Sequence, residues 1–411
     1  MPYYLDDTIE PSEIYYNILI KNNITGFDKD GNPIPIASSV PLVFDETRSI
    51  PYVYHPSKYY MSVLSFEMDT QSIPTFIVEP IPQAIDIHKT IYYVTITDAN
   101  DVPIVNGHQN IIWVPEDLSA PIPPSPVPDN FNEYPYYFGY TYSYFIELVN
   151  KAMAVACSGH TPVINHPPVL QLNNGIVSLV ASAQSALQRS FLTNELGQCV
   201  DVNGAPNPAG HKLFFNSELY YYFSSLKAIE RNEPLNGVQL NANFQLILNI
   251  NPSGTNYKQV RTDLTDVTAP FAHYDAVVST CEYPPIPFWN PVDSIVFTTN
   301  HLNVVPELIA ENAVTGVAAT SAAASNAEAY YILTDYAAPL YTGTEYKPNI
   351  FFQPQAEYRL SDLYGDNPVY QLVLNVYWKD KYGSLHTFLL ESGGTASLKV
   401  LFRKKVFYLD F

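Results

Sequence analysis

Residue types that could bind a metal ion form two local patterns in this sequence. His160 and His166 flank a proline-containing segment, and two imidazoles so close along the chain are a conceivable metal pair. Calcium prefers oxygen ligands in a loop with a glycine turn, and the nearest match surrounds Gly31 with Asp28, Asp30 and Asn32. We expect surface histidines and a solvated turn at these places, and therefore no metal site and no cofactor.

Catalytic motifs that depend on a fixed spacing do not occur in the sequence. There is no GxSxG elbow, no HExxH pair, no phosphate-binding loop and no dinucleotide fingerprint. Paired carboxylates of the glycosidase type could come from the 40 acidic residues. However, the chain has only three tryptophans for stacking on sugars. We therefore expect no enzymatic activity, with a β-sandwich hydrolase as the minor alternative.

Tyrosine, with 33 copies, is unusually abundant, and its densest cluster runs from Tyr134 to Tyr144. The tyrosine ring combines a large, rigid contact area with a polar tip, and it is enriched where proteins meet. The alternative is that the rings pack within the core around the neighbouring helices. The clusters predict a subunit contact made by Tyr136, Tyr137, Tyr140, Tyr142 and Tyr221.

The charge balance excludes several classes of partner. Forty acidic and 20 basic residues give a net charge of −20, which disfavours direct binding to nucleic acid or to an anionic membrane surface. No apolar run reaches the roughly 18 residues of a membrane span, and the N-terminus has no secretory pattern. The three cysteines, 157, 199 and 281, are too few and too widely spaced to predict a disulfide framework or a zinc site.

The elements that must carry these residues are mainly strands. Abundant tyrosine, phenylalanine and proline favour short strands between loops. Apolar residues at helical spacing predict a helix over 143–157 capped by Ser143, and Asn216 is placed to cap a second helix over 217–229. Asn174-Gly175 between two apolar runs predicts a hairpin. The predicted fold is mostly β: one or more antiparallel jelly-roll sandwiches with a small helical insertion.

Composition divides the chain into four predicted regions. The stretch 115–129 holds six prolines and excludes a helix or an inner strand, so we interpret it as a stiff connector. The regions are an N-terminal β region, 1–114, the proline-rich connector, 115–129, an insertion with two helices and a hairpin, 130–236, and a C-terminal jelly-roll region, 237–411.

The last third of the chain carries a recognisable pattern. Its segments are DSIVFTTN at 293–300, VVPE at 304–307, ILTDY at 332–336, QAEYRLSDL at 355–363, LNVYWKDKYG at 374–383 and SLKVLFR at 397–403. Together with segments 167–179 and 214–219, this pattern resembles the jelly-roll penton and minor capsid proteins of polinton-like viruses and virophages. The resemblance covers roughly residues 134–405, and residues 1–114 carry no matching motif.

The resemblance implies a structural protein of an icosahedral virion that is made in the host cytoplasm or nucleus. It implies self-association, with a pentamer favoured and a trimer possible, and contact with the major capsid protein. We expect Trp378 in the core of the closing sheet, and Arg359 and Asp362 as a charged pair. The alternatives are a double jelly-roll major capsid protein and a lectin-like receptor-binding or appendage module.

Overall fold

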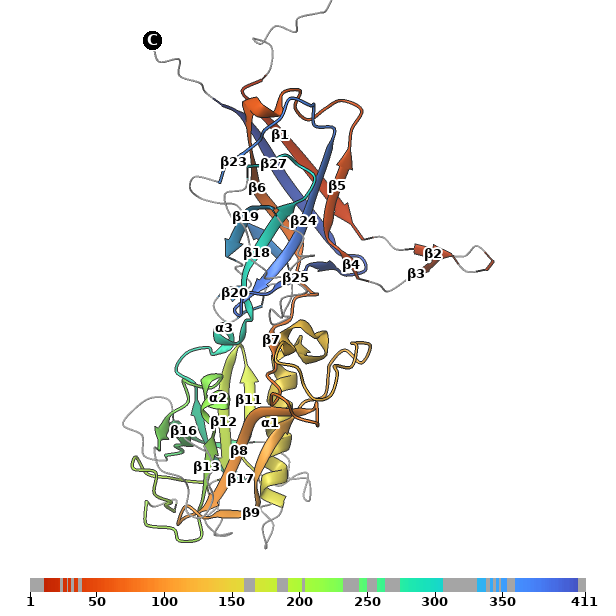
Figure 1. Ribbon diagram of the computed structural model, residues 1–411. Coiled ribbons are helices and arrows are strands. Elements are labelled where there is room, and N and C mark those ends of the chain that lie inside the picture. The colour runs from red at the N-terminus through yellow and green to blue at the C-terminus, as the bar shows by residue number, and fades with distance from the viewer. Residues whose placement is uncertain are drawn as a thin grey trace, which may run out of the picture. The chain divides into compact units, whose positions relative to one another are not determined.

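The computed structural model divides the chain into two compact units (Figure 1). Unit 1 comprises residues 1–73, 291–342 and 346–411, and unit 2 comprises residues 74–290 and 343–345. The structure describes residues 11–22, 25–27, 29–30, 33–35, 39–158, 167–182, 191–201, 204–231, 244–249, 257–262, 274–305, 331–337, 341–342, 345–346, 349–352 and 359–405.

Unit 1 contains two antiparallel sheets built from eight main strands. One sheet has the order β1-β27-β6-β22, and the other has the order β5-β24-β18-β19. Numbered one to eight along the chain, these strands form sheets 1-8-3-6 and 2-7-4-5, which is the paired Greek-key arrangement of a jelly roll. Their bounds are Glu13–Lys21 (β1), Val43–Thr47 (β5), Tyr59–Asp69 (β6), Val292–Thr299 (β18), Tyr331–Ala337 (β19), Asn349–Phe352 (β22), Gln371–Asp380 (β24) and Thr395–Lys404 (β27).

The other described elements of unit 1 are short, and one of them, β21, begins at Glu345 of unit 2. The two-residue strand β23 pairs with the start of β6, and β25 forms a hairpin with β24. The bounds are Thr25–Phe27 (β2), Pro33–Pro35 (β3), Val40–Pro41 (β4), Pro56–Lys58 (η1), Tyr341–Thr342 (β20), Glu345–Tyr346 (β21), Ser361–Asp362 (β23), Leu385–Thr387 (β25) and Leu389–Leu390 (β26).

The core of unit 1 lies between its two sheets. Strand β24 alternates strictly between buried and half-buried positions, because successive side chains of a strand point to opposite faces. Across the core, the ring of Phe66 on β6 lies 5.2 Å from the ring of Phe297 on β18 and 5.2 Å from the ring of Tyr336 on β19. Each fully buried side chain of this size stabilises the folded state by about 1.5–3 kcal/mol. The burial of these side chains therefore holds the apolar faces of the two sheets together.

Unit 2 has two further antiparallel sheets and most of the helical residues. Their orders are β14-β15-β13-β8-β9 and β11-β12-β17-β16, and helix α1 packs against β8, β9 and β11. The bounds are Phe76–Ile77 (β7), Lys89–Asp98 (β8), Pro103–Ile112 (β9), Phe131–Glu133 (η2), Pro135–Tyr137 (η3), Phe138–Gly139 (β10), Tyr142–Ser158 (α1), Val169–Asn173 (β11), Ile176–Ser182 (β12), His211–Phe215 (β13), Ser217–Tyr221 (α2), Ala228–Glu230 (β14), Phe244–Leu246 (β15), Tyr257–Thr262 (β16), Tyr274–Thr280 (β17) and Ile286–Trp289 (α3).

Local sequence signals are confirmed at several elements of unit 2. The hairpin β11–β12 turns at Asn174 and Gly175, and both residues have positive φ angles. The Asn216 side chain accepts a hydrogen bond from Leu219 N and caps α2, but this helix ends at Tyr221, well before residue 229. Helix α1 starts one residue before Ser143, which therefore does not cap it.

The two compact units differ from the four regions predicted from composition. The jelly roll is not confined to 237–411, because β1, β5 and β6 supply three of its eight strands and β1 pairs with the last strand, β27. Unit 2 is inserted between β6 and β18, and it includes the predicted connector. Composition reports local propensity, whereas the strand pairing that closes this sandwich joins residues nearly 400 positions apart.

The proline-rich stretch is part of the packing of unit 2. Val127 is fully buried, and its backbone exchanges hydrogen bonds with Gln83 and Ala84 at 3.1 and 3.0 Å. The Ser125 hydroxyl donates to Ile85 O at 2.8 Å. The prolines exclude regular structure, as predicted, but the stretch lies along the loop before β8 and does not separate two domains.

Candidate functional site

The tyrosine-rich segment lies in the interior of unit 2. Tyr137 is fully buried and Tyr136 nearly so. The Tyr136 hydroxyl lies 3.0 Å from His88 Nδ1, and Trp113 Nε1 donates to Tyr136 O at 2.7 Å. The Tyr137 hydroxyl donates to Ile87 O at 3.2 Å, and burial raises the pKa of Tyr137 to about 12. Both hydroxyls therefore have hydrogen-bonding partners within their own chain.

Helix α1 adds its first turn to the same aromatic core. The Tyr142 ring lies 5.4 Å from that of Trp289, and the Phe145 ring lies 5.6 Å from it. Trp289 Nε1 donates to Tyr222 O at 2.8 Å. The rings meet edge to face, as aromatic quadrupoles prefer, so these residues hold the helix against the sheets.

Glu116 organises the start of α1 from the predicted connector. Its carboxylate accepts hydrogen bonds from the backbone amides of Tyr140 and Thr141 and from the Thr141 hydroxyl. These groups directly precede the helix, where a negative charge also complements the helix dipole. Sequence reasoning placed this role on Ser143 because it looked only at neighbouring residues.

Burial corrects the prediction that the main tyrosine cluster contacts another subunit. Tyr136, Tyr137 and Tyr142 are each at least nine-tenths buried within unit 2, so they offer almost no surface to a partner. Tyr140 is half-buried. Tyr221 differs from them, since 53% of its surface is exposed. The alternative of core packing therefore describes most of the cluster, and Tyr221 keeps the surface needed for a contact.

Tyr221 belongs to an exposed aromatic patch that the sequence did not single out. We define the aromatic patch as Tyr221, Tyr283 and Phe288, all more than 40% exposed. The Phe288 ring lies 6.3 Å from the Tyr221 ring and 6.0 Å from the Tyr283 ring. The available signal was the segment EYPPIPFW at 282–289, in which three aromatic residues are interspersed with three prolines.

The surroundings of the aromatic patch are anionic. Glu218 precedes Tyr221 by one helical turn on α2, and Glu282 precedes Tyr283. The pKa of Glu79 is raised by burial and, secondarily, by the negative charge of Glu218. Like charges repel across an interface, so this surface suits a neutral or basic partner surface.

Arg359 and Asp362 do not form the predicted pair. Arg359 Nη1 lies 3.5 Å from Asp335 Oδ1, and Asp362 contacts the ammonium group of Lys405. Each side chain therefore has a partner from another segment of the chain. Trp378 is buried on β24, where its ring stacks on His386 at 3.9 Å.

Metal-binding geometry is not found among the residues that the structure describes. No group of three or more histidine, cysteine, aspartate or glutamate side chains converges there. His160, His166, Asp28 and Asn32 lie outside the described residues. Cys157, Cys199 and Cys281 are free thiols in the core, and burial raises the pKa of Cys157 to about 12 and that of Cys199 to about 11. The search for a membrane-spanning helix in the described part of the chain finds none.

Comparisons with known proteins identify relatives over nearly the whole length. A protein-family model described as "Sputnik minor capsid protein V18/19" matches residues 14–404. The chain is 32% identical over 161 residues to "Uncharacterized protein V18" of Sputnik virophage, which covers 36% of this chain and 84% of that protein. It is 27% identical over 196 residues to "Structural protein V19" of the same virophage, covering 47% and 81%.

Two solved structures share the fold. A chain in the cryo-EM structure of the Sputnik virophage aligns with a TM-score of 0.69 and 24% identity, over 96% of this chain and 99% of that chain. The crystal structure of the mavirus penton protein aligns with a TM-score of 0.59 and 19% identity, over 96% and 100%. Both alignments therefore include the jelly roll and most of the inserted unit.

Proposed function

The chain belongs to the family of Sputnik minor capsid protein V18/19, and from this premise we propose that it forms the pentameric penton of a virophage shell and contacts the major capsid protein. Family membership makes it a structural protein of the virion that assembles with other capsid proteins. The pentamer, the major capsid protein as direct neighbour and the aromatic patch as a contact are the proposed parts.

The observation that carries the penton assignment is the shared fold. The mavirus penton protein matches over its entire length, so the match includes both a jelly roll and an inserted unit. A double jelly-roll major capsid protein would need a second set of sheets in the order 1-8-3-6 and 2-7-4-5. In the part of unit 2 that the structure describes, the sheet orders are different, which supports the penton over that alternative.

A ring of five copies needs two different surfaces that meet head to tail. The aromatic patch supplies one candidate surface, because tyrosine and phenylalanine are enriched at the centres of protein interfaces. We assign Tyr221 to the subunit contact on this basis, and we assign Tyr140 to its margin as a weaker contributor because it is half-buried. Synthesis in the host cytoplasm or nucleus stays a prediction.

The test is the mass of the purified protein, measured by size exclusion with light scattering at low and moderate salt. We expect five copies of the 46.1 kDa chain, or about 230 kDa. A stable trimer would contradict the penton assignment. If the protein purifies as a monomer, cryo-EM of virions carrying an epitope-tagged chain decides the question: density at the five-fold vertices is expected, and density at other positions would overturn the assignment.

A further inference from the structure

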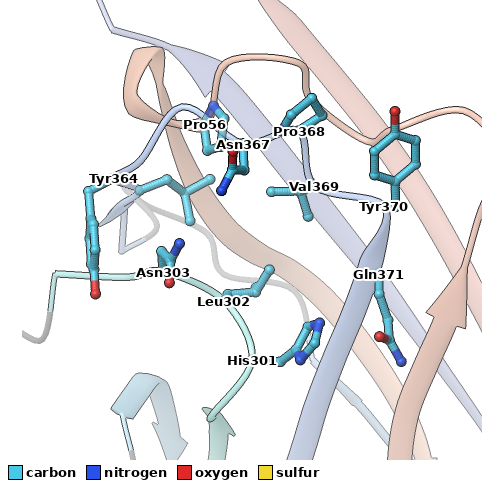
Figure 2. Close-up of a pocket in the computed structure, with 11 residues that line it drawn as sticks. Pro56, His301, Leu302, Asn303, Tyr364, Asn367, Pro368, Val369, Tyr370 and Gln371 are labelled. Atoms are coloured by element: carbon cyan, nitrogen blue, oxygen red, sulfur yellow. The ribbon is translucent and has the colours of Figure 1, made fainter.

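A pocket of about 130 Å³ opens at the end of the unit 1 jelly roll where β18 ends and β24 begins (Figure 2). Leu302, Pro368 and Val369 provide an apolar floor, and Leu363 also lines the pocket. Figure 2 shows the amides of Asn303 and Asn367 directed toward the space between the two loops. The volume suits one large side chain and is too small for a folded partner.

The two amides at this pocket have no hydrogen-bond partner among the side chains and backbone that the structure describes. Asn303 accepts a bond from Tyr364 N through its backbone carbonyl only. A side-chain amide has one acceptor and two donor hydrogens, which matches the carbonyl and N–H of an extended peptide. The pocket therefore combines an apolar floor with groups that suit a peptide backbone.

Exposed apolar side chains gather around the pocket. The loop before η1 runs beside the start of β24, since Tyr52 N donates to Val369 O at 2.7 Å and Arg48 N donates to Tyr370 O at 2.9 Å. We define the terminal patch as five exposed apolar residues: Ile50 and Tyr54 before η1, Val305 after β18, Tyr364 after β23 and Tyr370 before β24. A concentration of exposed apolar surface next to a pocket is typical of a surface that another segment covers.

Lys405 brings the C-terminal end of β27 to the same place. Its ammonium group donates to Ser57 O at 2.7 Å and to Leu363 O at 2.9 Å, and its backbone N–H donates to Lys58 O at 2.7 Å. Leu363 lines the pocket, and Ser57 follows the lining residue Pro56. The chain after Lys405 therefore starts beside the pocket wall.

Residues 406–411, which lie outside the described residues, have the sequence Val-Phe-Tyr-Leu-Asp-Phe. Five of these six side chains are apolar or aromatic, and an extended hexapeptide reaches about 20 Å. We propose that this segment binds across the terminal patch of its own chain, with an aromatic side chain of Phe407 or Tyr408 on the pocket floor. Bound in this way, it would cover apolar surface that the described loops leave exposed.

The proposal is tested with a fluorescent hexapeptide of sequence Val-Phe-Tyr-Leu-Asp-Phe and full-length protein. A short tether gives an intramolecular segment an effective concentration in the millimolar range, so the native segment should exclude micromolar peptide. We expect the variant Phe407→Ser/Tyr408→Ser to bind the peptide at least tenfold more tightly than the native chain, measured by anisotropy. The matched control Asp410→Ser should behave like the native chain.

A second substitution locates the binding site. In the Phe407→Ser/Tyr408→Ser background, Asn367→Arg should abolish peptide binding by filling the pocket, and Asn17→Arg on the exposed face of β1 should not. Equal peptide binding by the native chain and the Phe407→Ser/Tyr408→Ser variant would overturn the proposal, as would binding that survives Asn367→Arg in a folded protein. If Phe407→Ser/Tyr408→Ser dissociates an oligomer, the segment binds to a neighbouring copy of the chain. The proposal that it binds to its own chain is then wrong.

Discussion

Tyr336 on β19 donates its hydroxyl hydrogen to the backbone carbonyl of Val63 on β6, so one side chain connects the two sheets of unit 1. Both residues are buried, and the bond lies beside the point where the β6–β27 register shifts, between Lys399 and Val400. A register shift leaves backbone groups without their regular ladder partners. The Tyr336 hydroxyl therefore supplies a hydrogen bond at an irregular point of the sheet.

Replacing Tyr336 with phenylalanine should lower the free energy of unfolding of unit 1 by about 1–3 kcal/mol, because the Val63 carbonyl would stay buried without this partner. Urea unfolding followed by circular dichroism measures the change. Tyr370→Phe, at an exposed tyrosine of the same unit, is the matched control and should be neutral. Equal stabilities of the two variants would mean that the Tyr336 hydroxyl contributes nothing.

Alkaline pH should destabilise the protein through its buried tyrosines. Burial raises the pKa of Tyr336 and of Tyr137 to about 12, whereas the unfolded value is about 10. A raised folded-state pKa means that the stabilisation is complete below pH 10 and is lost as the pH rises toward 12. Stability measured between pH 9 and 12 should fall, and the fall should be shallower in Tyr336→Phe. A tyrosinate absorbance that titrates fully near pH 10 in the folded protein would contradict this.

Trp378 lies at the centre of a side-chain arrangement that closes the β24–β25 hairpin. Its ring stacks on His386 at 3.9 Å, and His386 Nε2 lies 2.9 Å from Oδ2 of the fully buried Asp380. Trp378→Ala should cost about 3–5 kcal/mol through the cavity it leaves, measured by denaturant unfolding. Trp378→Phe keeps an aromatic ring and should cost clearly less. A cost below about 1 kcal/mol for Trp378→Ala would contradict the core assignment.

Sequence reasoning succeeded where the structural signal is local. Leu372, Leu374, Val376 and Trp378 stand at alternate positions in the sequence, and β24 buries all four on one face. The Asn-Gly turn and the Asn216 cap were also found, because each depends on the conformation of a few adjacent residues. The mostly β jelly-roll class followed from composition and from the pattern of the closing strands.

The same reasoning failed where distant segments decide the structure. The sequence of the tyrosine-rich cluster suggested an exposed contact surface, but Trp113 and Trp289, which lie outside the cluster, pack against it. Arg359 was assigned to Asp362 by proximity in sequence, whereas in the folded chain Asp335, 24 residues away, lies beside it. The aromatic patch was missed because Tyr221 and Phe288 meet only after folding.

The division into units predicts that residues 74–290 fold without the rest of the chain. This segment has its own sheets, and its aromatic core around Trp113 and Trp289 is made by its own residues. Expressed alone, it should show a near-ultraviolet circular dichroism signal and one cooperative unfolding transition. The region 130–236 predicted from composition lacks β8 and β9, against which α1 packs, and should not fold. Cooperative folding of the shorter fragment would contradict the unit boundaries.

The aromatic patch should control subunit association without contributing much to folding. Tyr221 and Phe288 are 53% and 42% exposed, so Tyr221→Ser with Phe288→Ser removes few intrachain contacts. If the patch lies at the centre of a subunit interface, losing two aromatic anchors should cost about 2 kcal/mol or more per contact and shift the assembly toward monomers at micromolar concentration.

Two matched variants distinguish this role from a general loss of stability. Tyr382→Ser changes a tyrosine on unit 1 that is 62% exposed, and it should leave the subunit number unchanged. Tyr137→Ser removes a fully buried ring, so it should lower the unfolding midpoint because a large cavity forms. Light scattering and thermal unfolding, measured on the same samples, separate the two effects. An unchanged subunit number in Tyr221→Ser/Phe288→Ser would exclude the aromatic patch from the interface, and the contact would then have to be sought on another face.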